Sequence, residues 1–256
     1  GEKAGIIKPG GVAVLAVQQM AAAEVLLRRC ADVSASVVRE GLEFGVRHRD
    51  VAVGGQVVAL QTPAGVYDEV YLPLHGAHQA HNAAAALAAV EVFFGAGDRM
   101  LDVDVVRQGF ASVESPGRME IVRSSPTVLV DAAHNPHGAT ALATALADEF
   151  SFERLVGVVG VLADKDAAGM LAALEPVLDG VVITEPRSPR AMPADDLAAV
   201  ARDVFTDDRV LVAADLVDAL DRAIALVDDP ESPSGAGVVV TGSVVTAGEA
   251  RTLLAG

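Results

Sequence analysis

Polar residues with useful chemistry follow an apolar segment near the middle of the chain. In VDAAHNPHGA, which covers 130–139, Asp131 and His134 come directly before a helix signal. Asn135 is a favourable N-cap residue and Pro136 fits the first helical position, so both have a sufficient structural explanation. Backbone N–H groups at a helix start bind anions, and a nearby carboxylate can accept ribose hydroxyls or hold a cation. The segment therefore indicates an anion site with Asp131 and His134 as its candidate groups.

Two further apolar segments also end in polar residues. Asp164 and Asp166 follow the segment at 155–162, and Ser243 follows the segment at 238–241. The carboxyl ends of parallel strands meet at one edge of a sheet, where ligands bind. Strand ends are also polar because loops are solvated, so the functional and the structural interpretations both stay open here.

Arg118 lies in SPGRMEIV (115–122), where it follows a Pro-Gly turn and precedes an expected strand. A guanidinium group can bind phosphate or ribose oxygens through two parallel hydrogen bonds. The structural alternative is an exposed arginine in a hinge, and this segment alone favours that alternative over a phosphate contact.

The first half of the chain holds two more candidate segments. LHGAHQAHNAAAAL (74–87) places His78 and Asn82 one helical turn apart on a shared face. A structural zinc site is disfavoured because it needs a closed ligand set, usually with Cys. The amide of Asn82 could instead recognise adenine, because it donates and accepts at once. In GEKAGIIKPG (1–10), Lys3 could simply belong to a surface ion pair of small energetic consequence.

The second half shows the alternation of elements that would position these residues. Short apolar strands are expected at 127–131, 155–162, 181–184, 210–212 and 238–241. Helical patterns follow them at 138–150, 166–178, 194–204, 216–227 and 246–254. Such alternation predicts a parallel sheet covered on both faces, that is, a doubly wound, Rossmann-like α/β domain.

The first half of the chain shows a different pattern of expected helices and strands. A strand at 11–17 precedes a helix at 21–30, and strands at 51–58 and 66–74 form a hairpin or meander joined through 62–65. A long Ala-rich helix at 77–94 and a helix at 103–111 then lead to Ser115-Pro116-Gly117, the expected domain boundary. The only linker-like tract is expected at 228–237.

Composition narrows the class of protein. Hydrophobic residues make up 52% and charged residues 21% of 256 residues, as in a well-packed globular protein. The net charge of −16 disfavours sequence-independent nucleic-acid binding, which needs clustered Lys and Arg.

No apolar run reaches the roughly 18 residues that a membrane span needs, and no basic, apolar leader is visible. Cys30 is the single cysteine, which fits a cytoplasmic protein. The start at Gly1, without Met, suggests a fragment.

Taken together, the segments resemble the folylpolyglutamate synthase/dihydrofolate synthase family, a branch of the Mur ligase superfamily. The matching stretches occur in family order and span essentially the whole chain: GEKAGIIKPG, LHGAHQAHNAAAAL, SPGRMEIV, LVDAAHNPHGA, GVLADKDAAGM and VVTGSVVTAGEAR. EKAGI and Gln79 favour the folate branch over the cell-wall ligases. The one departure is Ala132, where the family usually has Gly; alanine there requires φ below zero or a small strain.

The resemblance implies a fold and a set of roles. The fold would be a P-loop ATPase domain, of which residues 1–115 are the second part, followed by a Rossmann-like domain over 116–256, with the active site in the cleft between them. Lys3 would carry a carbamate that supports magnesium. Asn82 would contact adenine, Arg118 the nucleotide phosphates, and Asp131 the ribose or nucleotide.

The remaining matched residues would line the substrate cleft. His134 and Ser243 match positions near the phosphates and the incoming glutamate, with His134 as a catalytic candidate and Ser243 as an ATP-binding one. His78, Asp164 and Asp166 match positions in the substrate cleft without a firm role.

The resemblance also implies the reaction. ATP would phosphorylate the terminal carboxylate of dihydropteroate or a folate, and L-glutamate would displace the phosphate to form an amide. The cofactors would be ATP and Mg²⁺, with a monovalent cation such as K⁺ as an option, and the enzyme would be a cytoplasmic monomer without nucleic-acid or membrane partners. The sequence contains no GxxxxGK[ST] loop, so the P-loop and direct magnesium ligands would lie upstream, and the chain alone should be inactive. A Mur-type cell-wall ligase and a non-catalytic Rossmann-like binding module remain the alternatives.

Overall fold

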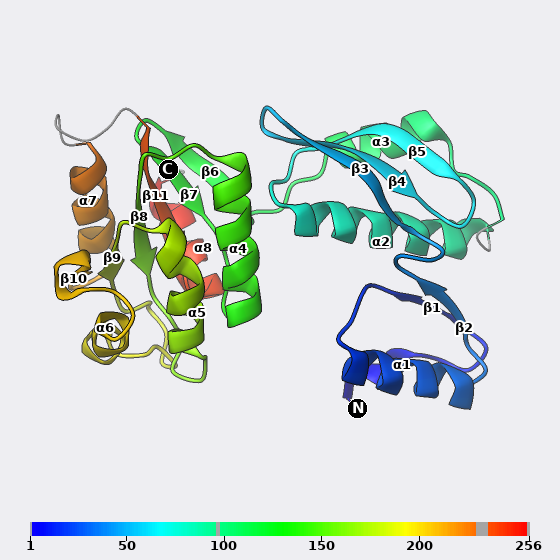
Figure 1. Ribbon diagram of the computed structural model, residues 1–256, viewed down its shortest axis with the longest axis horizontal. Coiled ribbons are helices and arrows are strands. Elements are labelled where there is room, and N and C mark those ends of the chain that lie inside the picture. The colour runs from blue at the N-terminus through cyan, green and yellow to red at the C-terminus, as the bar shows by residue number, and fades with distance from the viewer. Residues whose placement is uncertain (1, 96–97, 229–234, 255–256) are drawn as a thin grey trace. The chain divides into compact units, whose positions relative to one another are not determined.

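The computed structural model describes residues 2–95, 98–228 and 235–254, except the side chain of Glu2. It divides into two compact units, Gly1–Glu114 and Ser115–Gly256 (Figure 1). No helix among the described residues combines the length and the apolarity needed to cross a membrane.

The second unit is built on one sheet of six strands. The strands are β6 (Glu120–Ser124), β7 (Thr127–Val130), β8 (Arg154–Val159), β9 (Gly180–Ile183), β10 (Val210–Val212) and β11 (Ala236–Thr241). Their order is β10-β9-β8-β11-β7-β6. All neighbours pair in parallel except β6, which runs antiparallel to β7 at one edge.

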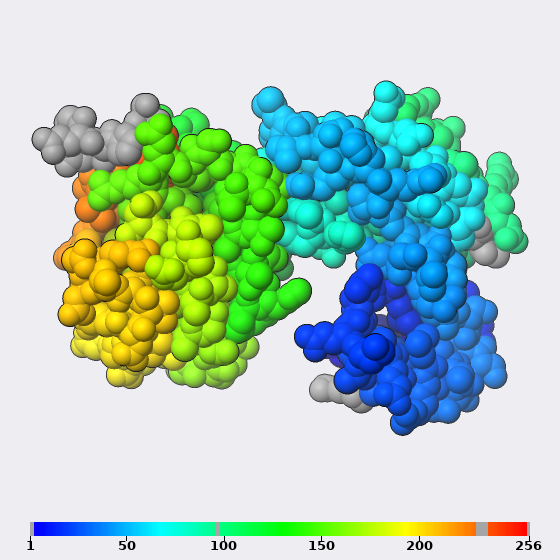
Figure 2. Space-filling view, viewed as in Figure 1, coloured from blue at the N-terminus to red at the C-terminus, as the bar shows by residue number. Residues whose placement is uncertain are grey.

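Helices cover both faces of this sheet (Figure 1). The helices are α4 (Pro136–Glu149), α5 (Ala167–Leu174), α6 (Ala194–Arg202), α7 (Leu216–Val227) and α8 (Val244–Leu254). Leu129 and Val239 pack with α4, α5 and α6, whereas Val128 and Val238 pack with α7 and α8. In the space-filling view, the yellow-green and yellow atoms of α5 and α6 cover the near face (Figure 2). The alternation of strand residues between two apolar cores makes this unit a doubly wound, Rossmann-like α/β fold.

The first unit contains two small sheets. β1 (Val12–Leu15) and β2 (Ser36–Arg39) pair in parallel and pack with α1 (Met20–Asp32) around the buried Cys30. β3 (Gly45–Ala52), β4 (Gly55–Gln61) and β5 (Val66–Leu72) form an antiparallel meander. The long helix α2 (Ala77–Gly95) and α3 (Val103–Ala111) pack with this meander around Leu60, Tyr67 and Leu87.

One predicted strand of the first unit is wrong. The segment 51–58 is not a single strand, because β3 ends at Ala52 and β4 begins at Gly55. Gly54 has φ of 73°, a left-handed conformation that closes the tight turn between the two strands. Valines before and after the turn continue the apolar pattern, so that pattern alone predicts one unbroken strand.

The other differences are smaller. β2 was not expected, and the helix expected at 166–178 is α5, followed by a short 3-10 turn at Glu175–Val177. The linker expected at 228–237 lies mostly outside the described residues.

Candidate functional site

The polar ends of three strands lie together in the second unit, as the topology predicts. The Gly242 N–H, after β11, donates to the Ala133 carbonyl at 3.2 Å, and the Gly160 N–H, after β8, donates to the Thr241 carbonyl at 3.2 Å. Gly242 has φ of 112°, and a Cβ atom there would lie 2.5 Å from the Gly160 oxygen. The backbones therefore approach closely at the edge of the sheet where parallel α/β folds bind ligands.

Asp131 is buried at this edge, with 6% of its surface exposed. Its Oδ1 accepts the Ala133 N–H at 2.8 Å, and its Oδ2 accepts the Met119 N–H at 3.0 Å. These bonds give the carboxylate a local structural role that the sequence did not reveal. Ala132 lies between these segments and is not among the described residues with positive φ, so alanine fits there without left-handed strain.

His134 lies at the start of α4. Its Nδ1 donates to the Ala132 carbonyl at 3.0 Å, because a carbonyl only accepts; in the neutral ring Nε2 is therefore the acceptor. Asn135 caps the helix by accepting the Gly138 N–H at 2.8 Å, and Pro136 occupies the first turn. The cap and the proline confirm the helix start that the sequence predicts.

Ser243 is fully buried at the start of α8. Its hydroxyl accepts the Thr246 N–H at 2.9 Å and pairs with the Thr246 hydroxyl at 2.8 Å. The Thr246 hydroxyl in turn donates to the Gly160 carbonyl at 2.8 Å. Ser243 thus fixes the helix start and the loop after β8, while contact with ATP stays a prediction.

Asp164 and Asp166 have separate roles. Asp164 pairs with Lys165 at 3.0 Å and with Arg190 at 2.8 Å. The hydrogen bond from Lys165 is the largest cause that lowers the pKa of Asp164; that from Arg190 adds to it, and burial opposes both. Asp166 caps α5 by accepting the Gly169 N–H at 2.9 Å. Neither arrangement assigns them to a ligand.

Arg118 is exposed in the turn before β6, and its guanidinium group makes no hydrogen bond or ion pair within the described part of the chain. Its backbone N–H donates to the Ser115 carbonyl at 3.2 Å. The geometry leaves its charged end available to an anionic ligand.

In the first unit, His78 and Asn82 lie in the first turns of α2. The exposed Asn82 donates to Gln79 Oε1 at 3.1 Å. The sequence reasoning missed Gln56, whose buried amide donates to the carbonyls of Leu74 and Gly76 at 2.6 and 3.1 Å. Gln56 therefore fixes the loop that leads into α2, and only its position in an otherwise apolar strand hints at this role.

The sequence reasoning also missed Glu40, whose side chain is 6% exposed. Its carboxylate pairs with His81 Nδ1 at 2.5 Å and accepts the Val17 N–H at 2.9 Å. Lys3 lies in the short 3-10 helix Glu2–Ile6, with its side chain exposed. Nothing in the described residues assigns a carbamate to it.

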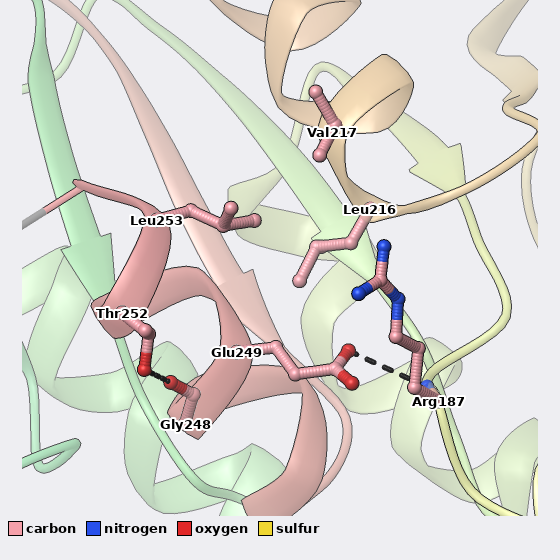
Figure 3. Close-up of a pocket in the computed structure, with 7 residues that line it drawn as sticks. All are labelled: Arg187, Leu216, Val217, Gly248, Glu249, Thr252 and Leu253. Atoms are coloured by element: carbon pink, nitrogen blue, oxygen red, sulfur yellow. Dashed lines mark hydrogen bonds between the residues drawn. The ribbon is translucent and has the colours of Figure 1, made fainter.

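An apolar cavity of about 250 Å³ lies between α7 and α8 (Figure 3). Leu216 and Leu253 flank it, and at its rim the Arg187 backbone N–H donates to Glu249 at 3.4 Å. It shares no residue with the predicted site. Within the described residues, no group of three or more His, Cys, Asp or Glu side chains could hold a metal ion.

Comparison with known proteins gives concordant matches. The family described as "Mur ligase, glutamate ligase domain" matches residues 117–244. The dihydrofolate synthase/folylpolyglutamate synthase of Mycobacterium tuberculosis is 56% identical over 268 aligned positions, which cover 99% of this chain and 55% of that protein.

Solved structures agree. The M. tuberculosis folylpolyglutamate synthase complexed with ADP matches with a TM-score of 0.96 and 56% identity, over 99% of this chain and 58% of that one. E. coli FolC in complex with DHPP and ADP matches with a TM-score of 0.81 and 28% identity, over 98% of this chain and 55% of that one.

The chain thus spans a little over half the length of the relatives it matches. The glutamate ligase domain itself accounts for half of the chain, and it coincides with the Rossmann-like unit described above. This chain belongs to the Mur ligase superfamily, in its folylpolyglutamate synthase/dihydrofolate synthase branch.

Proposed function

We propose that the protein containing this chain is an ATP-dependent ligase that adds L-glutamate to dihydropteroate, to tetrahydrofolate, or to both. The observation that carries the proposal is the match along 99% of the chain to a folylpolyglutamate synthase complexed with ADP. The carboxyl ends of three strands lie together around Asp131, where the backbones of Gly160 and Gly242 approach closely. This arrangement supports the proposal, because ligands bind at this edge of a parallel sheet.

The proposed nucleotide contacts come from three residues. Asn82 contacts adenine, since an amide both donates and accepts. Arg118 binds the phosphates through its guanidinium group, which is free of partners within the described residues. Asp131 contacts the nucleotide or ribose in addition to the backbone N–H groups that it already holds.

In the proposed reaction, a carboxylate oxygen of the acceptor attacks the γ-phosphorus of ATP, and ADP leaves. The glutamate amine then attacks the carbonyl carbon of the acyl phosphate, loses a proton and releases phosphate. Arg118 stabilises the transferring phosphoryl group electrostatically. His134, whose Nδ1 donates to the Ala132 carbonyl, presents Nε2 as a candidate acceptor for the proton of the amine. His78, Ser243, Asp164 and Asp166 stay proposed as residues of the substrate cleft.

Magnesium is part of the proposal, but the described residues of this chain provide few groups that could bind it. The described residues contain no cluster of three or more suitable side chains. The only group proposed to support the ion is a carbamate on Lys3, whose exposed amine could accept carbon dioxide. No step of the mechanism is therefore assigned to a metal held by these residues. Residues 1–115 are proposed as part of the ATP-binding domain, and a cytoplasmic monomer is proposed for the whole protein.

The experiment measures ADP release by the complete protein with ATP, Mg²⁺ and L-glutamate, using dihydropteroate, tetrahydrofolate or a muramoyl nucleotide as acceptor. We expect release only when glutamate and a folate-type acceptor are both present. Release with the muramoyl nucleotide instead would identify a cell-wall ligase. A folded protein that releases ADP with none of the acceptors would support a non-catalytic binding module.

A further inference from the structure

The turn that presents Arg118 is held by carboxylates on both sides. Before Arg118, the Gly117 N–H donates to Glu120 Oε2 at 2.8 Å. After it, the Met119 N–H donates to Asp131 Oδ2 at 3.0 Å. The Gly117 carbonyl accepts the Ala132 N–H at 2.8 Å. The backbone is therefore fixed on each side of an exposed side chain.

Part of this turn has an intrinsically unfavourable backbone conformation. Gly117 has φ of 69° and Met119 has φ of 48°, so both lie in the left-handed region. Glycine tolerates this conformation, but a residue with a Cβ atom does not favour it. Met119 is 2% exposed and packs in the apolar core, and this packing anchors the turn. An unfavourable backbone conformation persists where its surroundings determine it.

Glu120 is in turn held by Arg251 on α8. The Arg251 Nε donates to both carboxylate oxygens of Glu120, at 2.9 and 3.0 Å. The same Oε2 atom therefore accepts from the Gly117 backbone and from the Arg251 side chain. This pair links the last helix of the unit to the turn that carries Arg118.

We propose that Glu120 and Arg251 are positioning residues, which orient Arg118 for the phosphate groups of the nucleotide without contacting them. The inference rests on the proposed function. A positioning role predicts that loss of either residue lowers turnover by misplacing Arg118. Small misplacements of a charge that stabilises a transition state have large effects on rate.

The first test uses the complete protein and three substitutions. Arg251→Met keeps an unbranched side chain up to the position of Nε but removes the ion pair, and Glu120→Ala removes the hydrogen bonds to Gly117 and to Arg251. Both should lower kcat by about tenfold, whereas the KM for the folate acceptor stays within about twofold. Glu120→Gln retains an oxygen acceptor and should fall between Glu120→Ala and the wild type.

Arg222→Met is the matched control. Arg222 donates from Nε to Asp218 at 2.8 Å, and its side chain is 49% exposed, against 45% for Arg251. It lies on α7, and within the described residues its guanidinium group bonds to Asp218 and not to the turn, so the kcat of this variant should stay at the wild-type value. Equal losses in Arg222→Met and Arg251→Met would overturn the proposal, because the effect would then follow from any lost surface pair.

A double-mutant cycle tests whether the effect passes through Arg118. Arg118→Met should lower kcat by about 10²–10³-fold, and Glu120→Ala should add almost nothing in that background. If the losses of kcat in the two single variants instead multiply in the double variant, the positioning role is refuted and the proposed function is left intact. An Arg118→Met variant with normal turnover would instead contradict the proposed phosphate contact itself. Thermal unfolding of each variant checks that the fold is retained.

Discussion

In the core of the first unit, the hydroxyl of Tyr67 on β5 donates a hydrogen bond of 2.5 Å to Oε1 of Glu91 on α2. The same hydroxyl accepts the Leu101 N–H at 2.7 Å. Both side chains are 0% exposed, and Glu91 Oε2 has no hydrogen-bond partner among the described residues. Tyr67 thus joins the meander, the long helix and the loop before α3 through one oxygen atom.

Tyr67→Phe should destabilise the protein. It leaves the buried Glu91 Oε1 and the partly buried Leu101 N–H without their partner, which costs about 1–3 kcal/mol of unfolding free energy. Denaturant unfolding measures the change. Tyr71→Phe is the control, since its hydroxyl bonds the Val53 carbonyl at an exposed site and should matter by less than about 0.5 kcal/mol. Equal losses in the two variants would contradict a special role for Tyr67.

The same contact predicts a loss of stability at alkaline pH. Burial and then the hydrogen bond to Glu91 raise the pKa of Tyr67 from 10.0 to about 12, although the Leu101 N–H opposes this. The unfolded chain releases the phenol proton first, so the contribution is full below pH 10 and is lost as pH rises toward 12. Tyrosinate absorbance should include a step at about pH 12 that is absent from Tyr67→Phe. A wild-type titration that lacks this step, or a Tyr67→Phe variant that keeps it, would refute the shift.

Gly242→Ala should disrupt the edge where the strand ends meet. The residue has φ of 112°, and a Cβ atom would lie 2.5 Å from the Gly160 oxygen, so we expect a loss of about 1–3 kcal/mol in unfolding free energy. Gly109→Ala provides a contrast, since nothing lies within 4 Å of its Cβ position in α3. That change should stabilise the protein by up to about 1 kcal/mol. A Gly242→Ala variant of wild-type stability would mean that the close approach is absent.

Lys3→Ala should abolish most turnover in the complete protein if the lysine carries a carbamate. Losing a group that supports a catalytic cation should lower kcat by about 10²-fold or more. Lys8→Ala changes a second exposed lysine a few residues away and should leave kcat unchanged. Near-normal activity of Lys3→Ala would remove the carbamate assignment.

The sequence predicts the second unit well because its local signals agree with its packing. The strand at Val210–Val212 and the helix at Leu216–Val227 have the expected bounds, and Asp215 caps that helix as its position suggests. The strand wrongly expected at 51–58 contains a tight turn, which the Gly54-Gly55 pair signals in the sequence and the left-handed φ of Gly54 shows in the structure. By contrast, the antiparallel pairing of β6 with β7 is local, since a connection of two residues can join only antiparallel strands.

The residues proposed to contact the nucleotide were predictable from the sequence, whereas the residues that support them were not. Arg118 and Asp131 are conspicuous because each lies beside a turn and a strand end. Glu120 reads as an ordinary strand residue, since its partner Arg251 lies 131 positions away in the sequence and is brought to it by the fold. Hydrogen bonds between a side chain and a distant backbone group leave no spacing pattern, so supporting residues emerge only from the structure.

Incorporation of labelled glutamate, with heavy oxygen at both positions of the acceptor's terminal carboxylate, tests the ligase most directly. The complete protein would be supplied with ATP, Mg²⁺ and either dihydropteroate or tetrahydrofolate. The acyl-phosphate mechanism predicts that each glutamate incorporated accompanies one ADP and one phosphate carrying the heavy oxygen. No incorporation into either acceptor by a folded protein that binds ATP would contradict the proposed function, and incorporation with unlabelled phosphate would contradict the acyl phosphate.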